Sequence, residues 1–443
     1  MKKLFGTDGI RGVASFFFKH KIATKVGEYL GHYYKGQKIL IAKDTRLSSD
    51  ILEHELASAI ARCGANVYLL GYASTPALAY LSSHKDYACG IMISASHNPY
   101  YDNGIKIFAD NGLKINDDLE REIEAYIHSN ETIVIDDSEL CKIYEDDSIK
   151  DYYQFLNNHF NFKLPFKFIV DLANGANFKI AKDVFDLFKF DYTAINDKPS
   201  GKNINLNCGS THLESLKKAV ISNKVDFGLA FDGDGDRVLF VDADGEIFDG
   251  DKILYLLAKK LKATNQLNKD TIVTTVMSNI GLYKALDALA INYHKVAVGD
   301  KYVVKDMLEN DLILGGEQSG HIINKQYSNF GDGLLTALMV LEALAYFKIS
   351  LKEVAKEIKI YPQKLLNIKL ADKNKALNDP NFKKLEARIK ADLGSEGRVL
   401  IRPSGTENLL RLMIEAKNEA LIDLYLSELE NYLSDNYGPI YRS

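Results

Sequence analysis

The sequence predicts an α/β fold with three α/β domains, whose sheets are mixed and mainly parallel, followed by a smaller C-terminal α+β domain. At 443 residues the chain is too long for one hydrophobic core of ordinary size, so several domains are expected. Short β-forming runs alternate with helical patterns, and this rhythm begins three times along the chain. The C-terminal segment has a different order of strands and helices, which is typical of an α+β domain.

The first rhythm begins with an apolar strand predicted over residues 38–42. A helix is expected over residues 51–61, with Asp50 as its N-cap, because a carboxylate accepts hydrogen bonds from the free N–H groups of a first helical turn. Two more strands are predicted over residues 66–70 and 90–94. The strands that restart the rhythm are predicted at residues 166–170 and 271–275.

In the C-terminal segment, strands are predicted at residues 364–370, 397–401 and 409–415, and helices at residues 382–393 and 419–432. Taken together, these elements predict four domains, with boundaries near residues 150, 250 and 365. The domains are residues 1–150, 151–250, 251–365 and 366–443. The acidic stretch from Asp136 to Asp147 supports the first boundary.

Composition and charge argue against several classes of protein. The net charge of −5 disfavours a general nucleic-acid binder, which needs a basic face to displace counterions from phosphates. Four scattered cysteines without a Cys-x-x-Cys pair disfavour a disulfide framework or a zinc site. The beginning of the chain lacks an apolar signal sequence, and the apolar run from Ala337 to Phe347 contains Glu342 and is too short for a membrane span. We therefore expect a cytoplasmic protein with no nucleic-acid or membrane partner.

The first candidate site is the loop Ser94-Ala95-Ser96-His97-Asn98-Pro99, directly after a predicted buried strand. In open α/β sheets, ligands bind beyond the carboxyl ends of the strands. An exposed Ser96 on this turn is a candidate nucleophile or phosphorylated residue. Taken alone, the loop is explained better by a turn in which Ser and Asn side chains cap backbone groups.

The second candidate site is the loop Asp232-Gly233-Asp234-Gly235-Asp236-Arg237, between two predicted strands. Carboxylates at alternate positions can converge on one hard cation. A calcium EF-hand is disfavoured, because that loop needs Gly at the position of Arg237, Glu at the position of Ala243, and flanking helices. A plain acidic hairpin is also disfavoured, because three close carboxylates repel one another without a cation. The loop therefore predicts a magnesium site that bridges to a phosphate.

The third candidate site is the segment from Gly315 to His321, in which glycines allow a ligand to approach the backbone closely. Glu317 and Ser319 offer hydrogen-bonding groups suited to sugar hydroxyls, and His321 could move a proton near neutral pH. A Gly-rich turn with a solvated Glu remains the alternative for this segment.

The fourth candidate site is the loop Arg402-Pro403-Ser404-Gly405-Thr406-Glu407, between two predicted strands of the C-terminal segment. An Arg, two hydroxyls and the N–H groups of a Gly turn form a phosphate cradle. A tight β-turn is the alternative, since Pro-Ser-Gly is common turn chemistry. Chance assembly of all four loops, one in each predicted domain, is much less probable than any single match.

This set of loops, in this order, resembles the α-D-phosphohexomutase superfamily, and the resemblance spans essentially the whole chain. Within the superfamily, the glucosamine-phosphate branch is the most similar. The segments that carry this resemblance are Phe5 to Gly12, Asn103 to Lys106, Gly299 to Val303 and Glu317 to His321. The resemblance implies a heart-shaped enzyme around a central cleft. The implied reaction converts glucosamine 6-phosphate to glucosamine 1-phosphate for UDP-N-acetylglucosamine and cell-wall precursors.

The resemblance also implies roles for individual residues. Ser96 would be the phosphoserine, and Mg²⁺ would bind a phosphoserine oxygen with Asp232, Asp234 and Asp236. Lys106, His321 and Arg11 would be catalytic, with His97 and Arg237 as charge support near the phosphoserine. The substrate-binding residues would be Glu317, Ser319, Lys301, Arg402, Ser404, Gly405 and Thr406. A small phosphosugar is the expected substrate, with glucosamine or glucose 1,6-bisphosphate as intermediate and activator, and a homodimer is one expected assembly.

The chain departs from the superfamily pattern at two positions. Asn408 stands where Pro is usual, and Lys301 stands where Arg is usual, so that the charge is kept but the planar guanidinium fork is lost. A mutase acting on glucose or mannose phosphates is therefore an alternative. A non-catalytic sugar-phosphate sensor is another, although a sensor needs no nucleophile at Ser96.

Overall fold

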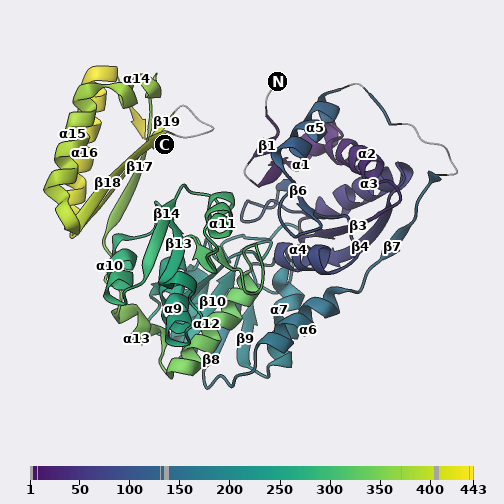
Figure 1. The fold of residues 1–443 in the computed structure, drawn as a ribbon, viewed down its shortest axis with the longest axis horizontal. Coiled ribbons are helices and arrows are strands. Elements are labelled where there is room, and N and C mark those ends of the chain that lie inside the picture. The colour runs from purple at the N-terminus through teal and green to yellow at the C-terminus, as the bar shows by residue number, and fades with distance from the viewer. Residues whose placement is uncertain are drawn as a thin grey trace. The chain divides into compact units, whose positions relative to one another are not determined.

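The computed structural model describes residues 3–6, 8–129, 131–133, 139–370, 372–403, 409–438 and 440–442. The chain forms two compact units. Unit 1 contains residues 1–277 and 291–355, and unit 2 contains residues 278–290 and 356–443. Each sheet is flanked by its own helices (Figure 1). The predicted fold class, with mixed and mainly parallel sheets and a smaller C-terminal α+β part, is confirmed.

The first sheet of unit 1 contains β1 (Phe5–Gly6), β2 (Gly9–Val13), β3 (Lys38–Lys43), β4 (Asn66–Tyr72), β5 (Cys89–Ile93), β6 (Asp102–Ala109) and β7 (Ile143–Glu145). The strand order is β1-β2-β6-β5-β3-β4-β7. Strands β3, β4, β5 and β7 are parallel, whereas β6, β2 and β1 add antiparallel pairs at one edge. The helices of this part are α1 (Ala14–Lys19), α2 (Ile22–Tyr33), α3 (Ser49–Arg62), α4 (Thr75–His84) and α5 (Asp117–His128).

The predicted role of Asp50 as an N-cap is wrong. Helix α3 begins at Ser49 with Ser48 in the capping position, and Asp50 lies within the first turn. A carboxylate is favourable there as well, because the N-terminal end of a helix carries partial positive charge. The sequence pattern therefore predicted the start of the helix to within two residues, but it did not distinguish the N-cap position from the first helical turn.

The second sheet of unit 1 contains β8 (Lys167–Asp171), β9 (Asp191–Ile195), β10 (Phe227–Phe231), β11 (Val238–Asp242) and β12 (Ile247–Phe248), in the order β12-β11-β10-β8-β9. Its helices are α6 (Ile149–His159), α7 (Asn177–Leu187) and α8 (Glu214–Asn223). Strands β8, β9 and β10 are parallel, and β10 forms an antiparallel hairpin with β11. All five residues of β10 are buried, because apolar side chains cover both of its faces.

The third sheet of unit 1 contains β13 (Thr271–Thr275), β14 (Asn292–Val296), β15 (Leu314–Gly316) and β16 (Ile322–Asn324), in the order β14-β13-β15-β16. Its helices are α9 (Gly250–Ala263), α11 (Asp300–Glu309), α12 (Gly333–Phe347) and α13 (Leu351–Lys356). Helix α12 holds the apolar run noted in the sequence, and most of its side chains are buried in the protein core. Among the described helices, none combines the length and hydropathy needed to cross a membrane.

Unit 2 contains β17 (Gln363–Lys369), β18 (Gly397–Pro403), β19 (Leu409–Ala416) and β20 (Tyr441–Arg442), an antiparallel sheet in the order β18-β19-β17-β20. Its helices are α10 (Ile280–Ala288), α14 (Lys373–Asn378), α15 (Pro380–Leu393) and α16 (Glu419–Tyr437). Helix α10 belongs to this unit although it falls within the third domain expected from the sequence. The four domain boundaries near residues 150, 250 and 365 stay predictions.

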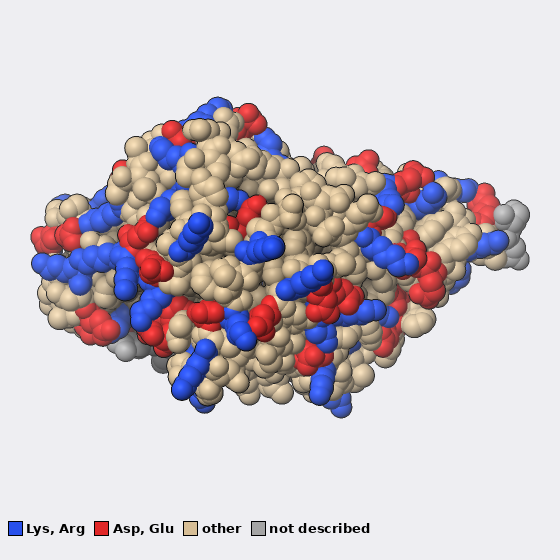
Figure 2. All heavy atoms as spheres, turned by 90° about the horizontal axis from the view of Figure 1, so that it is seen from below, with Lys and Arg blue, Asp and Glu red and all other residues tan. Residues whose placement is uncertain are grey.

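On the molecular face in Figure 2, acidic and basic side chains are interspersed. The site residues follow strand ends of unit 1. Ser96 follows β5, the aspartate loop joins β10 to β11, and Glu317 to His321 join β15 to β16. This is the end of a parallel sheet at which ligands usually bind.

Candidate active site

Ser96 is held in an uncommon backbone conformation beneath the aspartate loop. Its φ of 52° is left-handed, and its side chain is 1% exposed. The Ser96 N–H donates to Ser94 Oγ at 2.9 Å, and Ser96 Oγ donates to Asp232 Oδ2 at 2.8 Å. The expected exposure of Ser96 is therefore wrong, because the loop from β10 approaches it closely. A Cβ atom on Gly233 would lie 2.5 Å from the Ser96 carbonyl oxygen, so this approach requires glycine.

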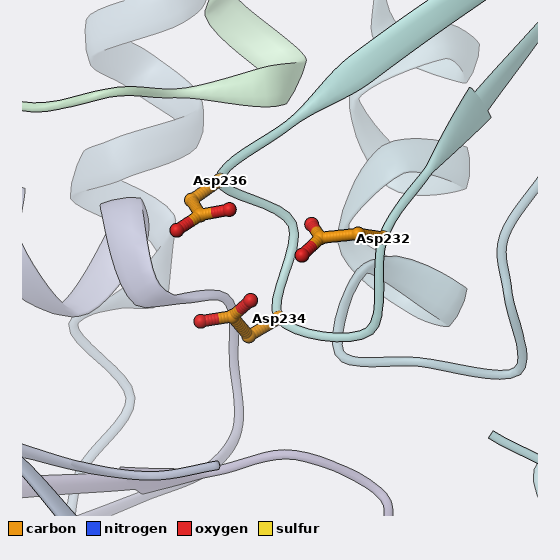
Figure 3. Close-up of side chains that lie close together, drawn as sticks. All are labelled: Asp232, Asp234 and Asp236. Atoms are coloured by element: carbon orange, nitrogen blue, oxygen red, sulfur yellow. The ribbon is translucent and has the colours of Figure 1, made fainter. Parts of the chain in front are cut away.

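Asp232, Asp234 and Asp236 form a buried cluster at the turn between β10 and β11. Their carboxylates point toward one another (Figure 3), and one oxygen from each lies within 4.8 Å of the others. Among the described residues, Asp234 Oδ1 and Asp236 Oδ1 have no hydrogen-bond partner. Burial raises the pKa of Asp232 well above its ordinary value, and the charges of Asp236 and Asp234 add to the increase. Orphaned oxygens and mutual repulsion are what a site built for a hard cation presents without it.

Lys106 provides a buried positive charge beside these carboxylates. Its Nζ lies 2.7 Å from Asp234 Oδ2 and 2.8 Å from Asp8 Oδ2. Burial alone would lower the pKa of Lys106, but the charges of Asp234 and Asp8 outweigh it and raise the pKa. Lys106 is therefore a cation at neutral pH.

His321 and Arg237 lie on the other side of the cluster. His321 Nδ1 is 3.7 Å from Asp236 Oδ2, and Arg237 Nε is 3.8 Å from Asp236 Oδ1. Burial opposes the charge on His321, but the nearby carboxylate of Asp236 raises the pKa of the imidazole. By contrast, burial and the charges of Arg237 and Arg11 lower the pKa of His97 to about 4. His97, 3.3 Å from Ser96 Oγ, is therefore neutral at pH 7.

A chain of alternating charges continues from Lys106 toward the third sheet. Asp8 pairs with Arg11 as well as Lys106, and Asp8 Oδ1 lies 2.8 Å from Lys114 Nζ. Lys114 Nζ in turn lies 2.6 Å from Asp300 Oδ2, at the first residue of α11. Sequence reasoning missed Asp8, Lys114 and Asp300 as site residues. Asp8 and Asp300 both lie inside segments already noted, Phe5 to Gly12 and Gly299 to Val303, but nothing in either segment or near Lys114 indicates that the three side chains meet.

Of the sugar-binding residues expected in unit 1, Lys301 lines a cavity of about 430 Å³, whereas Glu317 and Ser319 are not among its lining residues. The Gly299 N–H donates to Glu317 Oε1 at 3.0 Å, so Glu317 fixes the N-terminal end of α11, the helix that carries Lys301. Ser319 is half-buried in the same turn as Glu317. The charged and titratable side chains lining the cavity include Asp8, Lys106, Lys114, Asp300, Lys301 and His321.

Arg402 lies on β18 in unit 2, directly opposite Arg411 on β19. Burial lowers the pKa of Arg402, and the positive charge of Arg411 lowers it further. Within the described part of the chain, the Nε atoms of both side chains are buried and lack a hydrogen-bond partner. Two like charges placed opposite each other suit an anion between them. Sequence reasoning missed Arg411; Ser404, Gly405, Thr406 and Asn408 lie outside the described residues.

Comparison with known proteins identifies the family. Four phosphoglucomutase/phosphomannomutase domain models match in order: domain I over residues 2–133, domain II over 149–245, domain III over 249–361, and the C-terminal domain over 365–431. A phosphoglucosamine mutase from Limosilactobacillus reuteri is 44% identical over 438 residues, covering 96% of this chain and 97% of the relative.

Solved structures share the fold at lower identity. A phosphoglucomutase/phosphomannomutase family protein from Burkholderia thailandensis has a TM-score of 0.81 at 22% identity and covers 98% of this chain and 97% of its own. An N-acetylphosphoglucosamine mutase from Aspergillus fumigatus, solved with GlcNAc-6P and magnesium, has a TM-score of 0.71 at 17% identity, with 98% and 95% covered. The chain is therefore an enzyme of the phosphoglucomutase/phosphomannomutase family.

Proposed function

We propose that this enzyme interconverts glucosamine 6-phosphate and glucosamine 1-phosphate through a phosphoserine at Ser96 and a 1,6-bisphosphate intermediate. The observation that carries this proposal is the 2.8 Å contact between Ser96 Oγ and one of three converging buried carboxylates. The 44% identity to a phosphoglucosamine mutase over nearly the full chain supports the choice of substrate. The sensor alternative is set aside, because the chain is an enzyme of this family.

In the proposed reaction, the phosphoryl group moves from Ser96 Oγ to O1 of the 6-phosphate sugar. The bond between phosphorus and Ser96 Oγ breaks as the bond to O1 forms. The O1 hydroxyl loses its proton, and Ser96 Oγ gains one. The second half-reaction returns the O6 phosphoryl group to Ser96. Mg²⁺ held by Asp232, Asp234, Asp236 and Ser96 would neutralise charge on the transferring group. The fit of the site to such a cation rests on the orphaned oxygens of Asp234 and Asp236.

The charges of the neighbouring side chains suggest how the proton moves. Lys106 and His321 both have raised pKa values, so both are protonated and positively charged at neutral pH. They would stabilise the transferring phosphoryl group by charge and are the candidates for passing a proton between O1 and Ser96 Oγ. Arg11 and Arg237 would stabilise the phosphoryl group by charge, while neutral His97 would contribute a hydrogen bond. Phosphoryl transfer depends mainly on the positions and charges of the groups around the phosphate. These side chains would supply both, so the reaction needs no nucleophile besides Ser96.

Glu317 and Ser319 would bind hydroxyls of the sugar. Lys301, at the start of the helix that Glu317 holds, would contact the sugar from the cavity that it lines. Arg402 and Arg411, with the loop Ser404 to Thr406, would grip the phosphate that is not reacting. The cytoplasmic location and a homodimer stay predictions of the sequence.

Substrate preference tests the proposed function directly. We expect kcat/KM for glucosamine 6-phosphate to exceed that for glucose and mannose 6-phosphates by about tenfold to a hundredfold. The reason is that one charge-assisted contact to the amino group contributes about 1.5–3 kcal/mol. Equal or higher kcat/KM on glucose 6-phosphate would instead favour the glucose-phosphate alternative.

The Ser96→Ala variant should lose nearly all mutase activity, because no hydroxyl remains to accept the phosphoryl group. Incubation with glucose 1,6-bisphosphate should add one phosphate to the wild-type protein, as read by intact-protein mass spectrometry, and none to the variant. Ser58→Ala, at an exposed position on α3, is the control and should behave as wild type. Full activity in Ser96→Ala would remove the phosphoserine from the mechanism.

The Asp232→Asn variant should lower kcat by at least about 100-fold, because a metal contributes several kcal/mol of charge stabilisation. Its unfolding midpoint without metal should match or exceed that of wild type, since burial and two nearby carboxylates disfavour the ionised form of Asp232. Asp244→Asn, at an exposed turn, is the control. A chelator-treated enzyme that keeps full activity would contradict the metal site.

Arg402→Ala and Arg411→Ala should each reduce kcat/KM by about tenfold to a hundredfold, which corresponds to loss of one charge-assisted contact of about 1.5–3 kcal/mol. Each single variant should be no less stable than wild type, because it relieves repulsion between the two guanidinium groups. Arg388→Ala, at an exposed position on α15, serves as the control. Unchanged kinetics in both variants would show that the pair has no role in phosphate binding.

A further inference from the structure

Arg46 lies completely buried behind the nucleophile loop, at the carboxyl end of β3. Its side chain is 1% exposed. Nη2 donates to the carbonyl oxygens of Ser96 at 2.7 Å and Asn98 at 2.8 Å. Nη1 donates to the carbonyl oxygens of Pro99 and Asp102, the latter at 3.1 Å. One side chain therefore binds four carbonyls of the loop that carries Ser96.

Asp44 holds the guanidinium of Arg46 in place and connects it to the same loop. Arg46 Nε donates to Asp44 Oδ2 at 2.8 Å, and Ser94 Oγ donates to that oxygen at 2.6 Å. Ser49 Oγ donates to Asp44 Oδ1 at 3.0 Å. Because the ion pair is buried and hydrogen-bonded on both sides, it provides a fixed support rather than a mobile surface contact.

The number of hydrogen bonds that Arg46 makes shows whether it can bind a substrate phosphate or only holds the Ser96 loop. A guanidinium has five N–H donors, and here five acceptors occupy them: one carboxylate oxygen and four carbonyl oxygens. No donor remains to bind a substrate phosphate. The side chain acts on the loop and not on the substrate.

We call the contacts of Arg46 with these carbonyls a clamp. A second clamp comes from Asn205, in the segment between β9 and α8. Asn205 Nδ2 donates to the carbonyl oxygens of Ser96 at 2.9 Å and Asn98 at 3.1 Å, two of the carbonyls that Arg46 binds. Arg46 and Asn205 therefore both hold the Ser96 and Asn98 carbonyls, while the Ser96 hydroxyl donates to Asp232.

The clamp also accounts for the left-handed backbone of Ser96. A non-glycine residue with φ near 52° is sterically disfavoured, so the loop needs contacts that favour this conformation. We propose that Arg46, supported by Asp44, is a positioning residue for phosphoryl transfer: it fixes Ser96 in the conformation that aims Oγ at the metal-binding carboxylates. This proposal rests on the proposed role of Ser96.

The Arg46→Lys variant tests the proposal, because an ammonium keeps the charge but cannot reach four carbonyls in two directions. We expect kcat to fall by about 10- to 100-fold, as for a misplacement of about 1 Å, with KM within about twofold of wild type. Phosphorylation of Ser96 by glucose 1,6-bisphosphate, followed by quenched-flow mass spectrometry, should slow by the same factor. Arg62→Lys, at an exposed position on α3, should match wild type.

Asn205→Ala provides a second variant that leaves the buried ion pair intact. It should slow Ser96 phosphorylation less than Arg46→Lys does, again with little change in KM. Because both side chains bind the same two carbonyls, the double variant should lose less than the product of the single losses. If Arg46→Lys does not fold, as judged by circular dichroism, the kcat and KM values of Asn205→Ala decide the question.

The positioning role of Arg46 would be contradicted if Ser96 were phosphorylated at the wild-type rate in Arg46→Lys. Where that variant does not fold, the same result in Asn205→Ala would contradict it. Either result would leave the proposed function intact. A rise in KM equal to the fall in kcat would also contradict the positioning role, because the defect would then lie in substrate binding. If the wild-type protein itself accepts no phosphate at Ser96, the proposed function fails and the clamp fails with it.

Discussion

Mutual repulsion among three buried carboxylates is the constraint on which the candidate active site of unit 1 depends. Asp232, Asp234 and Asp236 lie too close together to be ionised at once without compensation. Lys106 contributes a buried ammonium to Asp234, and His321 and Arg237 approach Asp236. The cations come from different sheets of unit 1, so the acidic turn joins elements that are distant in sequence.

The same turn explains why the Ser96 loop and the aspartate loop are tightly connected. The Thr75 N–H, at the first residue of α4, donates to the Asp234 carbonyl oxygen at 2.9 Å, and the Thr75 hydroxyl donates to the Asp234 carboxylate. Gly233 packs against the Ser96 carbonyl, where a side chain would not fit. Backbone contacts of this kind leave little freedom for the distance between Ser96 Oγ and Asp232. Such fixed geometry suits a reaction that depends on position and charge.

Local patterns in the sequence predicted most of the fold and the parts of the site that lie on single loops. Strands such as residues 271–275 were found because apolar β-branched runs end in turn residues, and the aspartate loop was found because its carboxylates alternate with glycine. The roles of Arg46 and Lys114 could not be predicted, since their partners lie on other elements. The burial of Ser96 was also missed, because it arises from the approach of a loop more than a hundred residues away.

Helix α10 has a consequence for how the protein is made. Asn279 bonds to Tyr361, the Ile280 N–H donates to Glu415, and Arg398 donates to the Ser278 carbonyl, so the partners of this segment lie between residues 361 and 415. A ribosome synthesises residues 291–355 before it reaches the rest of unit 2. At about 5–20 residues per second, residues 278–290 wait several seconds for their partners. During that time the nascent chain carries a segment whose binding partners in unit 2 have not yet been synthesised.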